Sequence, residues 1–317
     1  MIPISENIVK KAISKYKIEI NKYIEERRGE IEKTKHKYRK NTEERIYFDK
    51  LYKDIDKILF IKPDEFKKIK RKYGVISISK KRNLSTPEKA EKERKKKFRD
   101  EVLKVLDYTS LRSKFYPKYF KEIGIKTCVY CNSQFTISTE EKAKFQIDHY
   151  VSKDKYPCLS ISFYNLYPSC ASCNNSKSNK KIEFKLYTNK ISETKKSEFE
   201  FILDKSCEAK FLTNRDIDVI KFEFTEPDIN KPFQKTFDIQ GIYDTQKDIV
   251  EELIIKKQMY NDAYKQTLKD SFPNLFNNST SLSNRIVIGN YSFADEIHKR
   301  PMSKFTQDIA RQLELIE

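Results

Sequence analysis

Two identical cysteine pairs constrain the fold of this chain more than any other feature of its sequence. The segments CVYC at 128–131 and CASC at 170–173 each present two thiols at the spacing of a metal-binding turn. Two such pairs complete a tetrahedral zinc site, and four sulfur ligands leave no open position, so the zinc would be structural. Four reduced core cysteines are the other interpretation, but two identical spacings rarely arise by chance. The expected zinc ligands are Cys128, Cys131, Cys170 and Cys173.

Composition narrows the class of protein. The 317 residues suggest about two domains, with one or three also allowed. The 65 Lys and Arg residues outnumber the 47 Asp and Glu residues, and the net charge of +18 predicts a polyanionic partner. Aromatic residues make up 13% of the chain, enough large side chains to build real cores, which argues against wholesale disorder.

The sequence also argues against several classes of protein. Only 5 glycines occur, and neither a P-loop nor a GxGxxG motif can be assembled from them, so the chain is not a nucleotide-driven motor by itself. The first residues, MIPISENIVKK, contain no apolar signal core, and no run approaches the ~18 apolar residues of a membrane span. Six cysteines in a long, Lys-rich chain favour a metal site over a disulfide scaffold. We therefore expect a cytoplasmic protein without a membrane segment.

Hydrophobic periodicity predicts the elements on either side of the cysteines. Helices are expected in the first third at 5–35, 42–60, 86–106 and 111–123. Beyond the cysteine segment we expect strands at 181–187, 198–204, 218–224 and 284–291. A long helix is expected at 245–269, a polar loop at 271–284, and a final helix after Pro301.

The segment between the cysteine pairs carries a second pattern. Asp148 and His149 end the strand-like run KFQID, Asn165 follows, and Asn174 and Lys177 come just after the last cysteine. This arrangement resembles the HNH nucleases of the ββα-metal, or His-Me finger, superfamily. In that family an Asp-His pair on the first strand is followed by a middle Asn and by an Asn or His that opens a helix. The bracketing cysteine pairs match its zinc-bound branch, and the resemblance covers about residues 124–182.

Phosphodiester hydrolysis explains why residues of these types would be needed. The reaction requires an activated water and positive charge where the leaving 3′ oxygen and the phosphoryl oxygens gain charge. A neutral imidazole can take the proton of the water at pH 7, so His149 is expected to be the general base. A hard divalent cation needs few protein ligands, because phosphate and water supply the rest. Asp148 and the carboxamide oxygen of Asn174 are therefore expected to hold Mg²⁺ or Mn²⁺. Since neighbouring strand residues face opposite sides, the strand must end or bulge at 148–149.

The remaining residues of the pattern are expected to support these three. By resemblance, Asn165 orients the loop and His149 without binding metal. Lys177 lies three positions after Asn174, hence on the same helix face, and could contact the phosphate. The alternative for Lys177 is a solvated surface lysine.

The sequence departs from the family at three positions. Ser152 stands where many relatives have Pro, and Asn175 stands where relatives often carry Arg, so one phosphate contact would be absent. Asn174 replaces a His, which gives a harder ligand and favours Mg²⁺ or Mn²⁺ over zinc in the catalytic site. Two other classes of zinc enzyme are excluded, because the sequence lacks both the His-x-Glu motif of nucleobase deaminases and the HExxH motif of metalloproteases.

Other conspicuous residues have simpler interpretations. Cys158 and Cys207 lack partners at ligand spacing and are expected to be ordinary buried thiols. His36 is expected to face solvent, and His298 to be a packed or capping residue rather than a second site. The basic stretch 89–99 is by default a solvated helix face, with a phosphate-tracking face as the alternative.

Longer stretches of the chain resemble the HNH subunits of Septu-type antiphage systems, which also occur beside some retrons. The resemblance rests on CVYCN, DHYVSKDKYPCLSISFYNLYPSC and GNYSFADEIHKRPMSKFTQDIARQL. Because those subunits work with an ATPase partner, the resemblance implies a bacterial defence nuclease with such a partner. We expect its substrate to be DNA, with RNA as the alternative. Two alternatives remain: a zinc-bound nucleic-acid-binding protein without catalysis, and a subunit whose basic surface docks an acidic partner.

Together these features predict a mainly helical α+β fold in three parts. A basic helical region is expected at 1–123, and a central ββα-metal HNH module with a four-cysteine zinc site at 124–185. A mixed α/β region is expected at 186–317 and would bind substrate or a partner.

Overall fold

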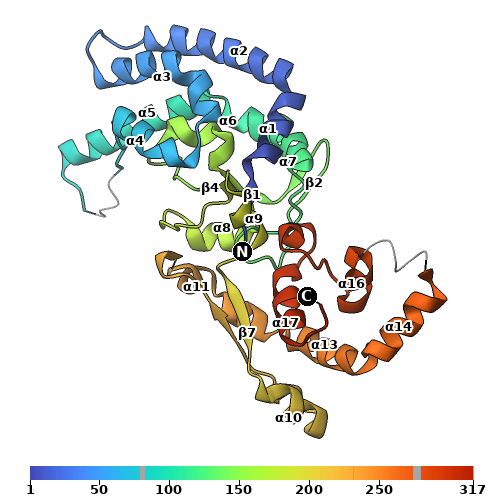
Figure 1. The fold of residues 1–317 in the computed structure, drawn as a ribbon. Coiled ribbons are helices and arrows are strands. Elements are labelled where there is room, and N and C mark those ends of the chain that lie inside the picture. The colour runs from blue at the N-terminus through green and yellow to red at the C-terminus, as the bar shows by residue number, and fades with distance from the viewer. Residues whose placement is uncertain (79–82, 231, 274–279, 317) are drawn as a thin grey trace.

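The computed structural model describes residues 1–78, 83–230, 232–273 and 280–316. Figure 1 shows the amino-terminal helices at one end, the cysteine-bearing segment in the middle and the carboxy-terminal elements at the other end. The predicted α+β fold, mainly helical with small sheets, is confirmed. Among the described residues, no helix is both long and apolar enough to cross a membrane.

The amino-terminal part is a helical layer that begins with local capping signals. Thr42 accepts a hydrogen bond from the Arg45 amide at 3.3 Å, and Ser85 forms a capping box with Glu88. The expected single helix at 5–35 is instead two helices that meet at Tyr16, whose φ of −106° departs from helical geometry. The elements are α1 (Glu6–Lys15), α2 (Lys17–Lys35), α3 (Glu43–Phe60), η1 (Pro63–Glu65), α4 (Phe66–Tyr73), α5 (Thr86–Val105), α6 (Tyr108–Ser110), the π-helical turn η2 (Leu111–Phe115) and α7 (Tyr116–Ile123).

The middle part contains a two-stranded antiparallel sheet followed by a helix. Strands β4 (Gln146–His149) and β5 (Leu166–Ser169) pair with Asp148 opposite Tyr167. Helix α8 (Ala171–Lys177) starts directly after Cys170 and closes a ββα unit. The remaining elements are β2 (Ile137–Ser138), β3 (Ala143–Lys144), η3 (Pro157–Ile161) and η4 (Phe163–Asn165).

The carboxy-terminal part contains a two-stranded antiparallel sheet surrounded by helices. Phe201, Phe222 and Phe224 are buried on the paired strands β7 and β8, as alternation predicted. Strand β6, at residues 187–188, pairs in parallel with strand β1, at residues 4–5. The amino terminus of the chain therefore lies beside the segment that follows the cysteine-bearing part. The elements are β1 (Ile4–Ser5), β6 (Tyr187–Thr188), α9 (Ile191–Lys195), β7 (Glu200–Leu203), α10 (Ser206–Asn214), η5 (Ile217–Val219), β8 (Phe222–Thr225), η6 (Asp228–Asn230), α11 (Pro232–Phe237), α12 (Ile239–Asp244), α13 (Lys247–Met259), α14 (Asp262–Ser271), α16 (Thr280–Ile288), η7 (Ala294–Lys299) and α17 (Ser303–Gln312).

Several predictions for this part were wrong. Of the strand expected at 181–187 only Tyr187 lies in a strand, and the polar loop expected at 271–284 is helix from Thr280 onward, while residues 274–279 lie outside the described residues. Residues 284–288 of the expected strand at 284–291 form the end of helix α16, which packs against α13 and α17 and buries Val287 and Ile288, and residues 289–291 follow it outside any strand. Packing therefore overrides the strand preference of this β-branched run. The expected helix at 245–269 is divided into α13 and α14, because the chain leaves the helix at Tyr260 and Asn261 caps the next one.

Candidate active site and metal-binding cluster

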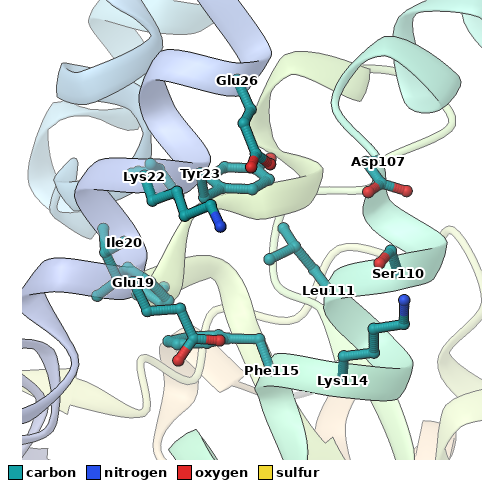
Figure 2. A pocket seen from close by; sticks show the side chains of 12 residues that line it. Glu19, Ile20, Lys22, Tyr23, Glu26, Asp107, Ser110, Leu111, Lys114 and Phe115 are labelled. Carbon is teal, nitrogen blue, oxygen red and sulfur yellow. The ribbon is translucent and has the colours of Figure 1, made fainter.

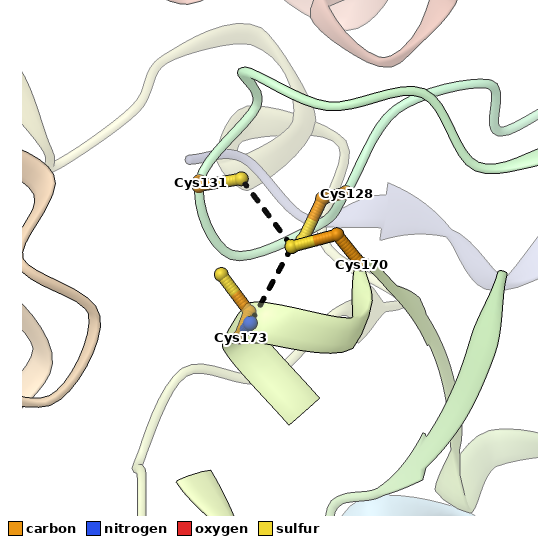
Figure 3. Close-up of side chains that lie close together, drawn as sticks. All are labelled: Cys128, Cys131, Cys170 and Cys173. Carbon is orange, nitrogen blue, oxygen red and sulfur yellow. Dashed lines mark hydrogen bonds between the residues drawn. The ribbon is translucent and has the colours of Figure 1, made fainter. Parts of the chain in front are cut away.

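The four predicted cysteines come together in one cluster (Figure 3). Their sulfur atoms all lie within 4.8 Å of one another, and the sulfurs of Cys131 and Cys170 are 4.0 Å apart. A tetrahedral zinc with bonds of about 2.3 Å places its sulfur ligands roughly 3.8 Å apart, so the cluster has the size and the donor set for that ion. Cys158 and Cys207 are buried elsewhere, as expected.

Two hydrogen-bond donors point at the sulfurs of this cluster. The Ser133 hydroxyl donates to the sulfur of Cys131 at 3.1 Å, and the Cys173 amide donates to the sulfur of Cys170 at 3.4 Å. Such donors favour the thiolate form, which is the form that binds metal. The amide of Cys173 can reach Cys170 because helix α8 begins between these two residues.

A polar cavity of about 320 Å³ lies beside β4. Asp148 and His149 line it from the end of β4, and Asn174 lines it from α8. The strand ends at His149, which is how two neighbouring residues can border the same space. The structure thus brings Asn174 to the same cavity as the neighbouring pair Asp148 and His149, while the catalytic roles of the three residues stay predictions.

Asp148 is buried and held by two donors on the same oxygen. The Tyr130 hydroxyl donates to its Oδ2 at 2.5 Å, and the ammonium nitrogen of Lys177 lies 2.9 Å from that atom. Among the described residues no hydrogen bond or ion pair uses Oδ1, which leaves this oxygen for a further ligand. A buried carboxylate needs such partners, because an unpaired one is strongly destabilising.

Lys177 is buried beside the Asp-His pair. Its side chain is only 2% exposed, so it is not a solvated surface lysine. The ammonium group binds Asp148 and also donates to the backbone carbonyl of His149 at 2.8 Å. A contact with phosphate would require this group to leave both partners.

His149 is buried and fixed on two sides. Its Nε2 lies 3.0 Å from the Ser160 carbonyl oxygen, and its ring centroid is 5.3 Å from that of Tyr108. Because a carbonyl only accepts, Nε2 carries the hydrogen and Nδ1 carries the lone pair. Burial lowers the pKa of His149 to about 3, so the imidazole is neutral at pH 7. An anionic phosphate beside the ring would raise this pKa again.

Asn165 ties down the loop that follows His149. Its side-chain oxygen accepts a hydrogen bond from the Val151 amide at 2.7 Å. Its amide nitrogen donates to the carbonyls of Val151 at 3.0 Å and Leu159 at 2.8 Å. Asn165 is fully buried and is not among the residues that line the cavity, an arrangement compatible with the orienting role predicted for it.

The turn after His149 forms with Ser152 in place of the Pro of many relatives. The Ser152 carbonyl accepts hydrogen bonds from the amides of Lys155 at 3.2 Å and Tyr156 at 3.0 Å. The Ser152 hydroxyl donates to the Asn179 side chain at 2.6 Å, so the loop is joined to the end of α8. Asn175 is exposed and borders the cavity.

Several residues around the site were not predicted from the sequence. Tyr130, between two cysteines of the cluster, holds Asp148, and Lys153, Tyr108 and Arg112 line the cavity. Tyr130 and Lys153 lie within the pattern but have no spacing that marks them. Tyr108 and Arg112 lie in the helical region, and their i, i+4 spacing places them on one face without saying what that face meets.

The two other histidines lie outside this site. His298 is buried, with Nε2 2.8 Å from the Ile2 carbonyl oxygen, and it is a packed residue as expected. His36 is exposed on the surface of the helical part, with its side chain 63% accessible.

Comparison with known proteins decides what the ββα unit is. Residues 128–180 match the family model of the HNH endonucleases. We call this segment, which is similar to those enzymes, the HNH domain. A stretch of 56 residues is 38% identical to the Septu protein PtuB of Bacillus thuringiensis. The match covers 18% of this chain and 21% of the relative, so the chain spans about a fifth of the length of the curated protein it matches.

These matches confirm the resemblance predicted from the cysteine pairs and the Asp-His motif. No solved structure matches the chain. The HNH domain coincides with the ββα unit and includes all four cysteines of the cluster.

Proposed function

We propose that this chain is a metal-dependent endonuclease that hydrolyses phosphodiester bonds in nucleic acid. The observation that carries the proposal is the shared cavity: Asp148, His149 and Asn174 border one polar space within a segment that matches the HNH endonucleases. An imidazole, a carboxylate and a carboxamide around one cavity are the groups needed to activate water and to hold a hard cation.

Each residue has a separate task in the proposed reaction. His149 accepts the proton of the attacking water at Nδ1, while its Nε2–H bond to the Ser160 carbonyl keeps the ring in place. Asp148, through the oxygen that Tyr130 and Lys177 leave open, and Asn174 would hold Mg²⁺ or Mn²⁺. Such an ion supplies positive charge where the phosphoryl and leaving oxygens gain charge. Asn165 keeps the loop after His149 in position.

The second proposed metal is a structural zinc held by the four cysteines. Full sulfur coordination would leave it no position for water, so it would stabilise the fold and take no part in hydrolysis. The proposed division of the chain places this module at 124–185, between a basic helical region at 1–123 and a mixed region at 186–317.

The similarity to a Septu protein supports a role in antiphage defence, beside the ATPase partner that the resemblance implies. The net charge of +18 supports nucleic acid as the substrate class, and we propose DNA rather than RNA. A nuclease of this kind would work in the cytoplasm, where phage nucleic acid enters.

The test is cleavage of plasmid DNA and of RNA by the purified chain, with Mg²⁺ or Mn²⁺ and with EDTA. We expect the metal-containing reactions to cut DNA, EDTA to stop them, and His149→Ala to abolish cutting while binding persists. The matched control is His36→Ala, which changes an exposed histidine outside the site and should cut normally. Binding without cleavage by the unmodified chain, alone and with its ATPase partner, would instead support the inactive nucleic-acid-binding alternative.

A further inference from the structure

One wall of the cavity comes from outside the segment that matches the HNH family. Tyr108 on α6 and Arg112 on η2 line the cavity together with Asp148 and His149. The two residues are four positions apart and therefore share one face of their helical segment. The other face of the same segment lines a separate pocket, into which Leu111 and Phe115 project (Figure 2).

Two positively charged side chains line the cavity next to the residues proposed for catalysis. They are Arg112 from the helical region and Lys153 from the loop after His149. The Lys153 ammonium lies 4.5 Å from the ring centroid of Tyr108, and the Tyr108 ring packs against His149. The Arg112 guanidinium donates to the side chain of Gln146, on β4, at 2.8 Å.

Neither of these cations forms an ion pair with a carboxylate within the described part of the chain. This contrasts with Lys177, which is neutralised by Asp148 at 2.9 Å. Tyr108 and Gln146 hold the two cations in place without cancelling their charge. Asp148 and Asp154 also line the cavity, but Asp148 is paired with Lys177 and Asp154 lies 3.9 Å from the Arg99 guanidinium. Among the described residues, Arg112 and Lys153 therefore have no carboxylate in ion-pair contact and can attract an anion.

We propose that Arg112 and Lys153 form a phosphate-binding subsite that holds the backbone of the nucleic-acid strand beside the scissile bond. The inference rests on the proposed nuclease function and identifies the residues that bind the substrate backbone at that site. The planar fork of Arg112 can bind two phosphate oxygens at once, and Lys153 adds a point charge. The amino-terminal helical region then completes the nuclease site, since one of the two cations comes from it.

The first test measures binding without cleavage, in the His149→Ala chain. The His149→Ala chain is titrated into a labelled DNA duplex at several KCl concentrations. The titration is repeated with two double variants, which carry Arg112→Ala or Lys153→Ala in addition to His149→Ala. Each substitution should weaken binding about tenfold and reduce the slope of log affinity against log salt by about one. The control is Lys114→Ala, which removes an exposed cation from the same turn but from the face that lines the separate pocket.

The second test measures cleavage with His149 intact. Arg112→Ala and Lys153→Ala should raise KM, and Arg112→Lys should recover part of the loss, because it restores the charge without the fork. Unchanged affinity, salt slope and KM in both alanine variants of a chain that does cut would overturn the subsite. If the unmodified chain cuts nothing but the two substitutions still weaken binding, the subsite stands and the proposed nuclease function fails.

Discussion

Asp148 and its partners are the most informative group at the scale of single residues. The carboxylate is 7% exposed, and its Oδ2 is shared by the Tyr130 hydroxyl and the Lys177 ammonium. Lys177 also binds the His149 carbonyl, so one buried cation touches both residues of the Asp-His pair. A cation there holds the carboxylate in place before any metal arrives, although its charge opposes that of the metal.

Lys177→Met should therefore make folding depend on divalent ions. The substitution leaves Asp148 buried with only the Tyr130 hydroxyl, which should lower the free energy of unfolding by about 3 kcal/mol in EDTA. Mn²⁺ should restore part of this loss in the variant and stabilise the unmodified chain less, because it places positive charge beside the carboxylate again. Urea unfolding with and without Mn²⁺ measures both effects.

The control for this experiment is Lys180→Met, which removes an exposed lysine just after α8. Its unfolding free energy should stay within about 0.5 kcal/mol of the unmodified chain. Equal stability of the two variants in EDTA would show that Lys177 does not compensate Asp148.

At the scale of elements, the sequence predicts correctly those features that depend only on residues close together in the chain. The two cysteine pairs are short-range patterns, and the structure brings them together as predicted. The helices expected to start near residues 42 and 86 do so, with Thr42 and Ser85 as their caps. The run at 286–288 has strand preference but lies in a helix, because its neighbours α13 and α17 decide its conformation.

In the candidate site, too, the sequence predicts the local pattern but not the contacts between distant segments. The Asp-His pair and Asn174 could be found because their spacing is a recognisable pattern. The contact of Arg112 with Gln146 joins the helical region to β4, and the contact of Tyr130 with Asp148 joins the cysteine loop to the same strand. No periodicity connects these positions, so only the folded arrangement reveals them.

The loop between β4 and β5 gives a prediction at this scale. Asn165→Asp keeps the shape of the side chain but replaces the amide donor to the carbonyls of Val151 and Leu159 by a carboxylate oxygen. We expect kcat to fall about 10- to 100-fold with little change in KM, because the loop that carries His149 loses its support and the substrate contacts remain. Steady-state cleavage kinetics measure the two constants separately.

The comparison variant for the loop is Asn214→Asp, which makes the same chemical change at an exposed residue at the end of α10. It should leave kcat and KM unaltered. A purely folding role for Asn165 would appear as a lower fraction of active enzyme, with the same KM and a restored rate at lower temperature.

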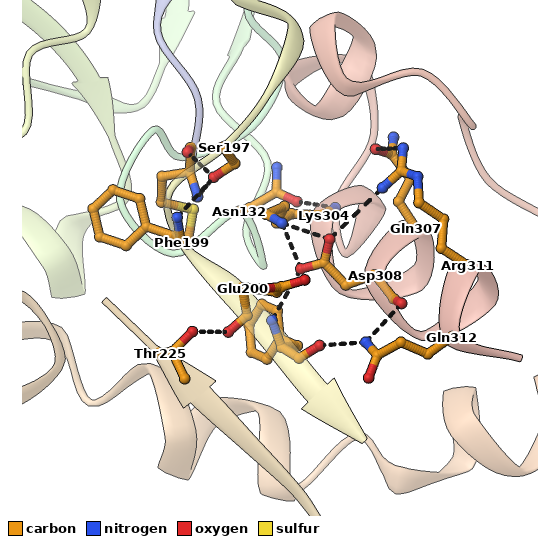
Figure 4. A network of polar contacts seen from close by, with 12 residues as sticks. Asn132, Ser197, Phe199, Glu200, Thr225, Lys304, Gln307, Asp308, Arg311 and Gln312 are labelled. Atoms are coloured by element: carbon orange, nitrogen blue, oxygen red, sulfur yellow. Dashed lines mark hydrogen bonds and ion pairs between the residues drawn. The ribbon is translucent and has the colours of Figure 1, made fainter. Parts of the chain in front are cut away.

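At the scale of the whole molecule, the cysteine cluster lies at the joint between the HNH domain and the carboxy-terminal elements. The Tyr243 hydroxyl donates to the Cys131 carbonyl at 2.8 Å. The buried Asn132 side chain donates to the Ile297 carbonyl at 2.7 Å and accepts from the Lys304 amide at 3.0 Å, at the start of α17 (Figure 4). Helix α17 is in turn bound to β7, where Asp308 accepts from the Phe201 amide at 3.0 Å.

Cys170→Ser should therefore loosen the carboxy-terminal elements as well as the cluster. Zinc content should fall from about one atom per chain to none, and the amides of α17 should exchange hydrogen faster, because the loop that carries Asn132 is no longer held at Cys131. Cys207→Ala, a cysteine outside the cluster, should keep the metal and the protection of α17. Loss of zinc with unchanged exchange in α17 would mean that the packing of Tyr243 and Asn132 holds the joint without the ion.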